Sequence, residues 1–210
     1  MVRLLAGDRF KPGLLGEVLL VIADRKPIFQ RSDLVRSEAL IRLRVGEETV
    51  ARKSSEDADR ELAAAGDKLK FSLTFNPTDS FLWMMLYSHG TSSSGFDSKA
   101  VGYLEQSYTT GPCEGWIALR RNRLALAAFP TFSEVMKRRV VSEFAEIVDS
   151  DFIEAATSNL IGIGWEERTR LVASLSRANI IAREAFAKAL AREGVTIAVP
   201  GVDVDRRFWQ

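Results

Sequence analysis

The feature that most constrains the fold is an uninterrupted apolar run in the middle of the chain, Phe81-Leu82-Trp83-Met84-Met85-Leu86-Tyr87. Because the run has no polar side, we expect it to be buried all round, either as the central strand of a sheet or as a segment of a core helix. It is too short to span a bilayer. The chain then becomes polar with His89, the only histidine, and with Gly90-Thr91-Ser92-Ser93-Ser94-Gly95. The sequence therefore predicts a buried segment that presents a hydroxyl-rich loop at the surface, where many folds hold ligands.

The composition indicates a globular chain without a strong charge preference. Of its 210 residues, 46% are hydrophobic and 27% are charged, which is enough for a core in a single domain. The 29 Lys and Arg residues nearly balance the 28 Asp and Glu residues, so no overall field attracts nucleic acid or an anionic membrane. The single cysteine, Cys113, excludes an internal disulfide framework and fits a reducing compartment. With no recognisable signal peptide, we expect a cytoplasmic protein without a membrane partner, and the excess of arginine over lysine favours a bacterial source.

The first part of the chain has the alternation that is typical of strands. Polar and apolar residues alternate in two stretches, whose apolar members are Leu69, Phe71, Leu73 and Phe75 in one and Ile41, Leu43 and Val45 in the other. Apolar residues also flank Arg120-Arg121-Asn122-Arg123, which predicts a hairpin with a basic tip. Residues 53–68 are charged and alanine-rich, so we expect a short exposed helix that ends at Gly66. Residues 14–128 are therefore predicted to be mostly β.

The second part of the chain has helical periodicity. Apolar residues recur at steps of three and four over residues 132–148, and Thr131 with Glu134 forms a capping-box pattern. A short second helix through Leu160 and a long helix over residues 165–193 are expected to follow, with a final short strand at residues 195–199. The predicted fold is therefore α+β in a single domain. Its β-rich part (1–129), mixed or mainly antiparallel, packs against two or three helices (about 131–193).

His89 and Cys113 are the first candidates for catalysis. An imidazole after a buried strand, with a thiol in the later turn Gly111-Pro112-Cys113-Glu114-Gly115, resembles the order of groups in caspase-like cysteine peptidases. The resemblance implies that His89 assists a Cys113 thiolate in attacking a carbonyl, while nearby amides stabilise the oxyanion. The chain departs from that family because its cysteine follows a polar turn instead of an apolar strand. The 23 residues between the pair also leave little room for a helical crossover and a strand.

The Gly/Ser stretch after His89 is a second candidate site. It has the G-x-x-x-x-G frame of a Walker A loop, but Phe96 and Asp97 occupy the positions of the Lys and Ser/Thr that bind phosphate and Mg²⁺. We therefore expect no ordinary nucleoside triphosphatase and keep a looser anion nest as the alternative. The nest would consist of Gly90, Ser92, Ser93, Ser94 and Gly95.

The carboxylates offer one further pattern. Pro77-Thr78-Asp79 and Asp97-Ser98-Lys99 resemble the spacing of the metal-dependent P-D…D/E-x-K nucleases. Turn chemistry alone accounts for the first of these segments. One histidine and one cysteine cannot supply the usual ligands of zinc. We therefore predict no metal and no cofactor.

A cluster of arginines is the candidate for nucleic-acid binding. A basic hairpin tip and a nearby helix face could together contact phosphates, although acidic residues lie between them. The arginines are Arg120, Arg121, Arg123, Arg138 and Arg139.

No catalytic constellation is complete, so the sequence favours a non-catalytic protein that acts by macromolecular interaction. We expect a protein partner or self-association, because the helix predicted over 165–193 carries a seam of alanines suited to close helix–helix contact. The seam consists of Ala178, Ala182, Ala185 and Ala189. The simpler interpretation is that the alanine seam packs within its own domain and not against a partner. The alternative function is a cysteine hydrolase that uses His89 and Cys113.

Overall fold

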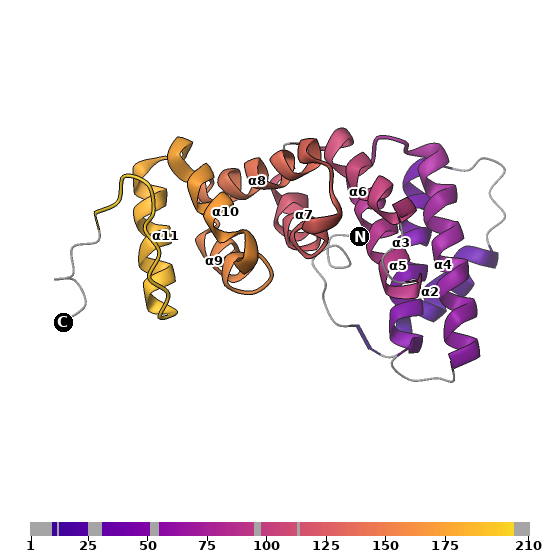
Figure 1. The fold of residues 1–210 in the computed structure, drawn as a ribbon. Helices are drawn as coiled ribbons and strands as arrows, with labels where there is room; N and C mark the ends of the chain where they lie inside the picture. Colours follow the sequence, from indigo (N-terminus) through magenta and orange to yellow (C-terminus); the bar gives the residue numbers. More distant parts are fainter. Residues whose placement is uncertain are drawn as a thin grey trace. The chain divides into compact units, whose positions relative to one another are not determined.

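The computed structural model describes residues 10–11, 13–24, 31–50, 55–94, 98–112 and 114–203. All regular structure in these ranges is helical (Figure 1). The predicted α+β fold is therefore wrong, both for its β-rich first part and for its final short strand. The chain divides into two compact units, Met1–Gly111 and Pro112–Gln210. The single-domain interpretation stays a prediction, and each unit is described by itself.

The described part of unit 1 contains five helices. They are α2 (Leu14–Asp24), α3 (Ser32–Val50), α4 (Ser55–Phe75), α5 (Ser80–Ser94) and α6 (Ser98–Thr110).

The alternation that predicted a strand at residues 69–75 consists of two helical pairs on α4. Leu69 and Leu73 lie four residues apart on the buried side of the helix. Phe71 and Phe75, also four apart, lie on the other side, each 39% exposed, and contact one another edge to face at 5.2 Å. Because residues four apart share a helix face, two i,i+4 pairs offset by two residues produce the same alternation as a strand.

Helix α3 packs along α4 through a stripe of apolar residues and one glycine. The buried residues recur at steps of three and four and are Val35, Ala39, Leu43 and Gly46. Glu38 accepts hydrogen bonds from Arg42 and from Lys68 of α4, both at 3.0 Å. Burial alone would raise the pKa of Glu38, but the hydrogen bonds and charges of Lys68 and Arg42 outweigh it, and the pKa falls below its ordinary value.

The turn predicted at residues 76–79 is confirmed, and it connects α4 to α5. Asp79 accepts a hydrogen bond from the backbone N–H of Leu82 at 3.0 Å and so caps α5. The same carboxylate pairs with Arg36 of α3 at 2.5 Å. One side chain therefore ends the turn, begins the next helix and attaches it to α3.

The central apolar run forms the first part of α5, so of the two expected forms the core helix is confirmed and the central strand is wrong. Its burial is confirmed except at Trp83 and Met85, which are half-buried. Leu82 and Met84 are fully buried and Leu86 is 2% exposed. Helices α5 and α6 form an antiparallel pair that is closed by Ser80 and Ser107. Each of these two hydroxyls donates to the other residue's carbonyl oxygen at 2.9 Å.

Gly66 lies inside α4, where the sequence predicted the end of a helix. A Cβ atom at this position would lie 2.7 Å from Nε2 of His89 on α5. Such a distance is too short for a non-bonded contact, so the glycine makes room for the imidazole.

Unit 2 begins with α7 (Gly115–Ala128) and continues with four more helices in its described part. They are α8 (Glu134–Asp149), α9 (Ile153–Ile161), α10 (Arg168–Ser174) and α11 (Ile180–Arg192). Short 3₁₀ turns are η1 (Phe129–Thr131), η2 (Trp165–Glu167) and η3 (Leu175–Arg177). The basic hairpin predicted around Arg120–Arg123 is wrong, because these residues lie in α7.

The first two helices predicted for residues 131–160 are confirmed as α8 and α9. The cap of α8 is Ser133, which accepts a hydrogen bond from the N–H of Met136 at 3.3 Å, and not Thr131. The predicted interruption between the helices contains Asp151, which has a φ of 65°. Aspartate tolerates this left-handed conformation better than most residues, which lets the chain reverse here.

The long helix predicted over residues 165–193 is broken. Ala178 is extended, and Asn179 begins α11 by accepting a hydrogen bond from the N–H of Ile181 at 2.9 Å. The buried side of α11 consists of Ala182, Phe186 and Leu190. Phe186 contacts Phe144 of α8 edge to face at 5.9 Å. Ala178 and Ala182 of the predicted alanine seam are both buried and are therefore used inside unit 2.

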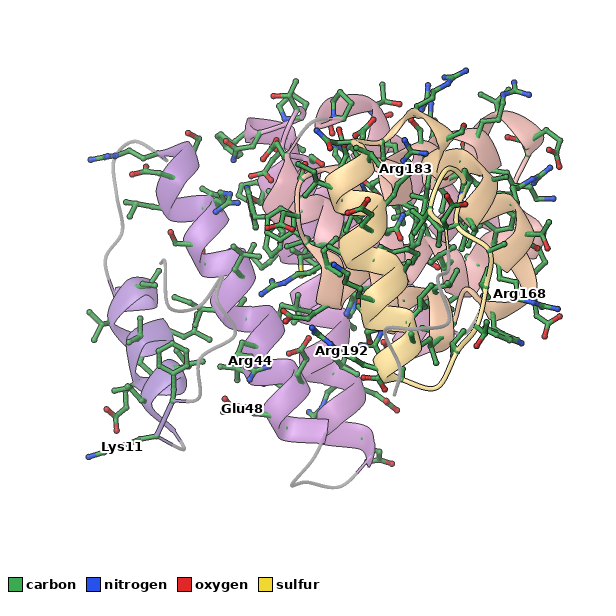
Figure 2. All side chains as sticks on the ribbon, turned by 90° about the vertical axis from the view of Figure 1, so that its left-hand side faces the viewer. Lys11, Arg44, Glu48, Arg168, Arg183 and Arg192 are labelled. Carbon is green, nitrogen blue, oxygen red and sulfur yellow. The ribbon has the colours of Figure 1, made fainter. Side chains whose placement is uncertain are left out.

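The end of α11 is confirmed at Gly194, which has a φ of 75°. The N–H of Val195 donates to the carbonyl of Leu190 at 2.9 Å, a common ending for a helix. Residues 195–203 then run back along α11 (Figure 1) without pairing as a strand. Arg183, labelled on α11 in Figure 2, donates to the carbonyl oxygen of Pro200 and holds this segment in place.

We predict opposite effects of alanine at two glycines of unit 1. Gly66→Ala should destabilise the protein by about 1–3 kcal/mol, because the new methyl overlaps His89. Gly102→Ala in α6 is the matched control, because a Cβ there meets nothing within 4 Å, and it should stabilise by about 0.5–1 kcal/mol. Urea unfolding measures both. In a His89→Ala background Gly66→Ala should no longer destabilise, and a loss that persisted there would contradict the assigned contact.

Candidate functional site

The candidate site is a groove of about 850 Å³ on unit 2, between α8 and the segment formed by α10 and η3. We refer to it as the α8–α10 groove. Its lining residues on α8 are Glu134, Arg138, Val141, Ser142, Ala145, Glu146 and Asp149. Those on the opposite side are Arg170, Ala173, Ser174, Ser176, Arg177 and Ala178.

The two walls of the groove run in the same direction. Glu134 pairs with Arg170 at 3.0 Å, and the carboxylate of Asp149 accepts a hydrogen bond from the N–H of Asn179 at 2.6 Å. Contacts therefore follow in the same order along both walls. Parallel neighbours require a crossover, which is supplied here by α9. Between these contacts, α8 rises about 22 Å at 1.5 Å per residue, which gives the length of the groove.

Many of the lining side chains are small, and we refer to them as the floor of the groove. They are Ala145 of α8 and Ala173, Ser174 and Ala178 of the opposite wall, with the apolar Val141 beside them. The hydroxyl of Ser174 donates to the carbonyl of Leu171 at 2.6 Å, so it is already engaged within its own helix. Small residues let the backbone of a ligand come close to both walls, as in the grooves that accept a peptide or a helix.

The three acidic residues of the groove already have partners. Glu134 accepts hydrogen bonds from Lys137 at 3.2 Å and from Arg170, and these cations hold its pKa below the ordinary value. Glu146 accepts a hydrogen bond from Ser142 at 3.3 Å, and Asp149 accepts the N–H of Asn179. Glu134 and Asp149 therefore connect the two walls of the groove, while Glu146 is engaged within α8.

Two of the three arginines of the groove have no such partner in the described part of the chain. Arg138 and Arg177 are exposed, and neither makes an ion pair or a hydrogen bond with any residue that the structure describes. Their guanidinium groups each carry several N–H donors. The groove thus presents two cations that are free to bind a ligand.

A buried polar network behind the groove holds α8 in place. Arg121 of α7 is fully buried and donates from Nε and Nη2 to Oε1 of Glu143 at 2.9 and 2.6 Å. Asn122 donates to the carbonyl of Val140 at 3.0 Å. The side chain of Asn159 on α9 reaches Oδ1 of Asn122 at 3.4 Å. The network therefore connects α7, α8 and α9 inside the core.

The arginines predicted to bind nucleic acid are separated by this arrangement. Arg121 is buried in the network, so it does not face solvent. Arg120 and Arg123 on α7 and Arg138 and Arg139 on α8 are exposed. Of the five, only Arg138 lines the groove. Binding of nucleic acid through the exposed members stays a prediction.

The residues predicted around His89 occupy a helix and not a loop. The chain continues as α5 from Gly90 through Ser94, and its backbone amides are used by the helix, so the predicted loop is wrong. The side chains of Ser93 and Ser94 and the whole of Gly95 lie outside the described residues, as does Cys113. The pairing of His89 with Cys113 therefore stays a prediction.

His89 itself is half-buried against α4. Burial lowers its pKa below 6.5, and the positive charge of Lys70 lowers it further, while Glu47 and Asp67 act in the opposite direction. The side chain is therefore neutral at pH 7.

Neither metal binding nor membrane insertion finds support in the described residues. No group of three or more His, Cys, Asp and Glu side chains there is placed to hold a metal ion. Asp79, one of the carboxylates of the nuclease-like pattern, is engaged as a helix cap and in an ion pair with Arg36. Asp97 lies outside the described residues. None of the described helices combines the length and the apolar character that crossing a bilayer requires.

No family model, no curated protein and no solved structure matches this chain. The function must therefore be inferred from the residues themselves.

The groove could not be found from the sequence alone, because its two walls are separated along the chain by α9. Its floor residues are small and unremarkable in type. The one available signal was the periodicity of α8, which left Glu134, Arg138, Val141 and Ala145 on a face away from the apolar stripe.

We predict that the buried pair of Arg121 and Glu143 tolerates joint replacement better than removal of one partner. Glu143→Ala should destabilise the protein by about 3–5 kcal/mol, because it leaves a buried guanidinium without its carboxylate. Arg121→Met with Glu143→Leu should recover most of that loss. Glu184→Ala, at an exposed position of α11, is the control and should change stability by less than about 0.5 kcal/mol. The free energy of unfolding of each variant is measured by thermal or urea unfolding. Equal losses for Glu143→Ala and Glu184→Ala would contradict the network.

We predict that protonation of His89 destabilises unit 1. Its folded pKa lies below the unfolded value of 6.5, so above that pH the imidazole is neutral in both states and does not affect stability. As the pH falls below 6.5, the unfolded chain takes up a proton first and stability is lost. The free energy of unfolding should therefore fall more between about pH 7.5 and pH 5.5 in the wild type than in His89→Gln. An equal fall in both proteins would show that other groups set the dependence.

Proposed function

We propose that this chain is a non-catalytic binding protein that recognises a segment of a partner protein in the α8–α10 groove. The observation that carries the proposal is the groove itself, in which two parallel walls enclose a floor of small side chains. No histidine or cysteine is among its described lining residues. Two of its three serines, Ser142 and Ser174, and its acids are engaged in hydrogen bonds within the fold, and no described histidine lines the groove to activate the third, Ser176. Such a surface is suited to hold a ligand and offers no activated nucleophile.

The dimensions of the groove favour a peptide over a small molecule or a second folded domain. A length of about 22 Å matches a helix of roughly 15 residues or an extended segment of about seven. Alanines on both walls permit the close approach that backbone recognition requires. The framework behind the groove is fixed by Arg121 and Glu143, so it is formed before the ligand arrives.

The other candidate functions have less support. Self-association through residues 165–193 was expected from a continuous alanine seam, but the segment is broken at Ala178 and Asn179, and the buried side of α11 packs within unit 2. No observation supports the cysteine hydrolase, because Cys113 lies outside the described residues. Binding of a partner segment is the proposal that the geometry favours.

The proposal predicts that blocking the groove abolishes peptide binding. Peptides of about 15 residues from a random displayed library would be selected on the full chain and their affinities measured by fluorescence anisotropy. Ala173→Trp, which fills the floor at an exposed alanine of α10, should weaken the selected peptides by about tenfold or more. Ala127→Trp, at an exposed alanine of α7 outside the groove, is the matched control and should leave binding unchanged.

Circular dichroism would establish that both variants remain folded. Failure to select any peptide, or equal loss in both variants, would overturn the proposal. Light scattering on the free chain identifies a further contrary outcome. If the protein is a stable dimer that Ala173→Trp dissociates, the groove holds a second copy and not a partner segment.

A further inference from the structure

The α8–α10 groove has equal numbers of positive and negative side chains, but they are not equally available to a ligand. Three arginines face three acidic residues along its length. All three acids accept hydrogen bonds from groups of this chain, while Arg138 and Arg177 bind no described residue. A ligand therefore meets two arginines with unused donors and carboxylates that are already hydrogen-bonded. This difference favours a ligand with negative side chains.

The register of the two walls places these arginines at different levels. Glu134 lies opposite Arg170, the hydroxyl of Ser174 lies 3.5 Å from the carbonyl of Val141, and Asp149 contacts Asn179. Interpolation between these contacts puts Arg177 level with about residue 146 of α8, eight residues beyond Arg138. At 1.5 Å per residue the separation along the groove is about 12 Å.

Resting on the function proposed above, we propose that the groove recognises an acidic peptide segment whose carboxylates pair with Arg138 and Arg177. Side chains about 12 Å apart are i and i+4 in an extended peptide, or i and i+7 or i+8 in a helix. Each guanidinium binds a carboxylate through charge-assisted hydrogen bonds, bidentate where the geometry allows. The alanine floor accepts the peptide backbone between these two anchors.

Nucleic acid fits the groove less well than such a peptide. A nucleic-acid backbone carries a negative charge at every nucleotide, so it cannot avoid the fixed carboxylates of Glu134, Glu146 and Asp149. A peptide places its charges at chosen positions and can leave the positions beside those carboxylates neutral or basic. The groove has two available cations among three fixed anions, so it favours a ligand whose negative charges are separated from one another.

The test compares the peptides selected by two forms of the full chain. The wild type should yield peptides enriched in Asp and Glu, with the spacing given above. The double variant Arg138→Glu with Arg177→Glu should yield peptides enriched in Lys and Arg instead. For the best wild-type peptide, replacing its Asp and Glu by Asn and Gln should weaken binding by about tenfold or more, and the affinity should fall with added salt.

Single variants assign the contacts. Arg138→Gln and Arg177→Gln should each weaken that peptide by about tenfold. Arg192→Gln is the matched control, because Arg192 is exposed at the end of α11 (Figure 2) and does not line the groove. A single-stranded oligodeoxynucleotide serves as the nucleic-acid probe and should not compete for the site.

The two proposals fail in different ways. Selected peptides that are neutral or basic, yet lose binding in Ala173→Trp, would overturn the acidic preference and keep the groove as a peptide site. Peptides insensitive to Ala173→Trp would overturn both proposals. Competition by the oligodeoxynucleotide that depends on Arg138 and Arg177 would show that the groove binds phosphates, which overturns the acidic peptide as its ligand.

Discussion

The buried ion pair of Arg121 and Glu143 is the interaction on which the candidate site depends. A helix that packs only through apolar side chains can rotate about its axis at modest cost, because one aliphatic contact replaces another. Glu143 cannot move in this way, since rotation would leave two opposite charges buried without partners. The pair therefore fixes which side of α8 faces the core. Phe144, beside Glu143, completes this side through its contact with Phe186, and the opposite side, with Arg138 and Ala145, becomes a wall of the groove.

Unit 1 uses a different device, the removal of side chains where helices must come close. Gly66 leaves room for His89, and the hydroxyls of Ser80 and Ser107 satisfy one another's carbonyls without added bulk. Asp79 caps α5 and also pairs with Arg36 of α3. The turn before α5 and the contact between α5 and α3 therefore depend on the same side chain. Large apolar side chains such as Leu69, Met84 and Tyr87 fill the remaining space between the helices.

The sequence predicted the second part of this fold better than the first, for a physical reason. In α8 the apolar residues form one stripe at steps of three and four, and Asp151 and Gly194 mark reversals that few other residues permit. In α4 the exposed pair Phe71 and Phe75 adds a second apolar face to the buried pair Leu69 and Leu73. Over seven residues, two apolar faces of a helix give the same alternating sequence as a strand. The break at Asn179 was missed because Leu175, Ala178 and Ala182 keep the spacing of one helix face across it. Arg121 looked like a surface cation, since its partner Glu143 lies in another helix.

The parallel arrangement of α8 and α10 gives the groove a direction. The backbone dipole of α8, the longer wall, makes its end near Glu134 and Arg170 the more electropositive and its end near Asp149 the more electronegative. A helical occupant has an equal dipole of its own and meets unequal environments in its two orientations. The orientation whose carboxyl end lies near Arg170 runs antiparallel to both walls and is the favoured one. A helical ligand of the proposed kind is therefore expected to bind in one orientation, whatever its side chains.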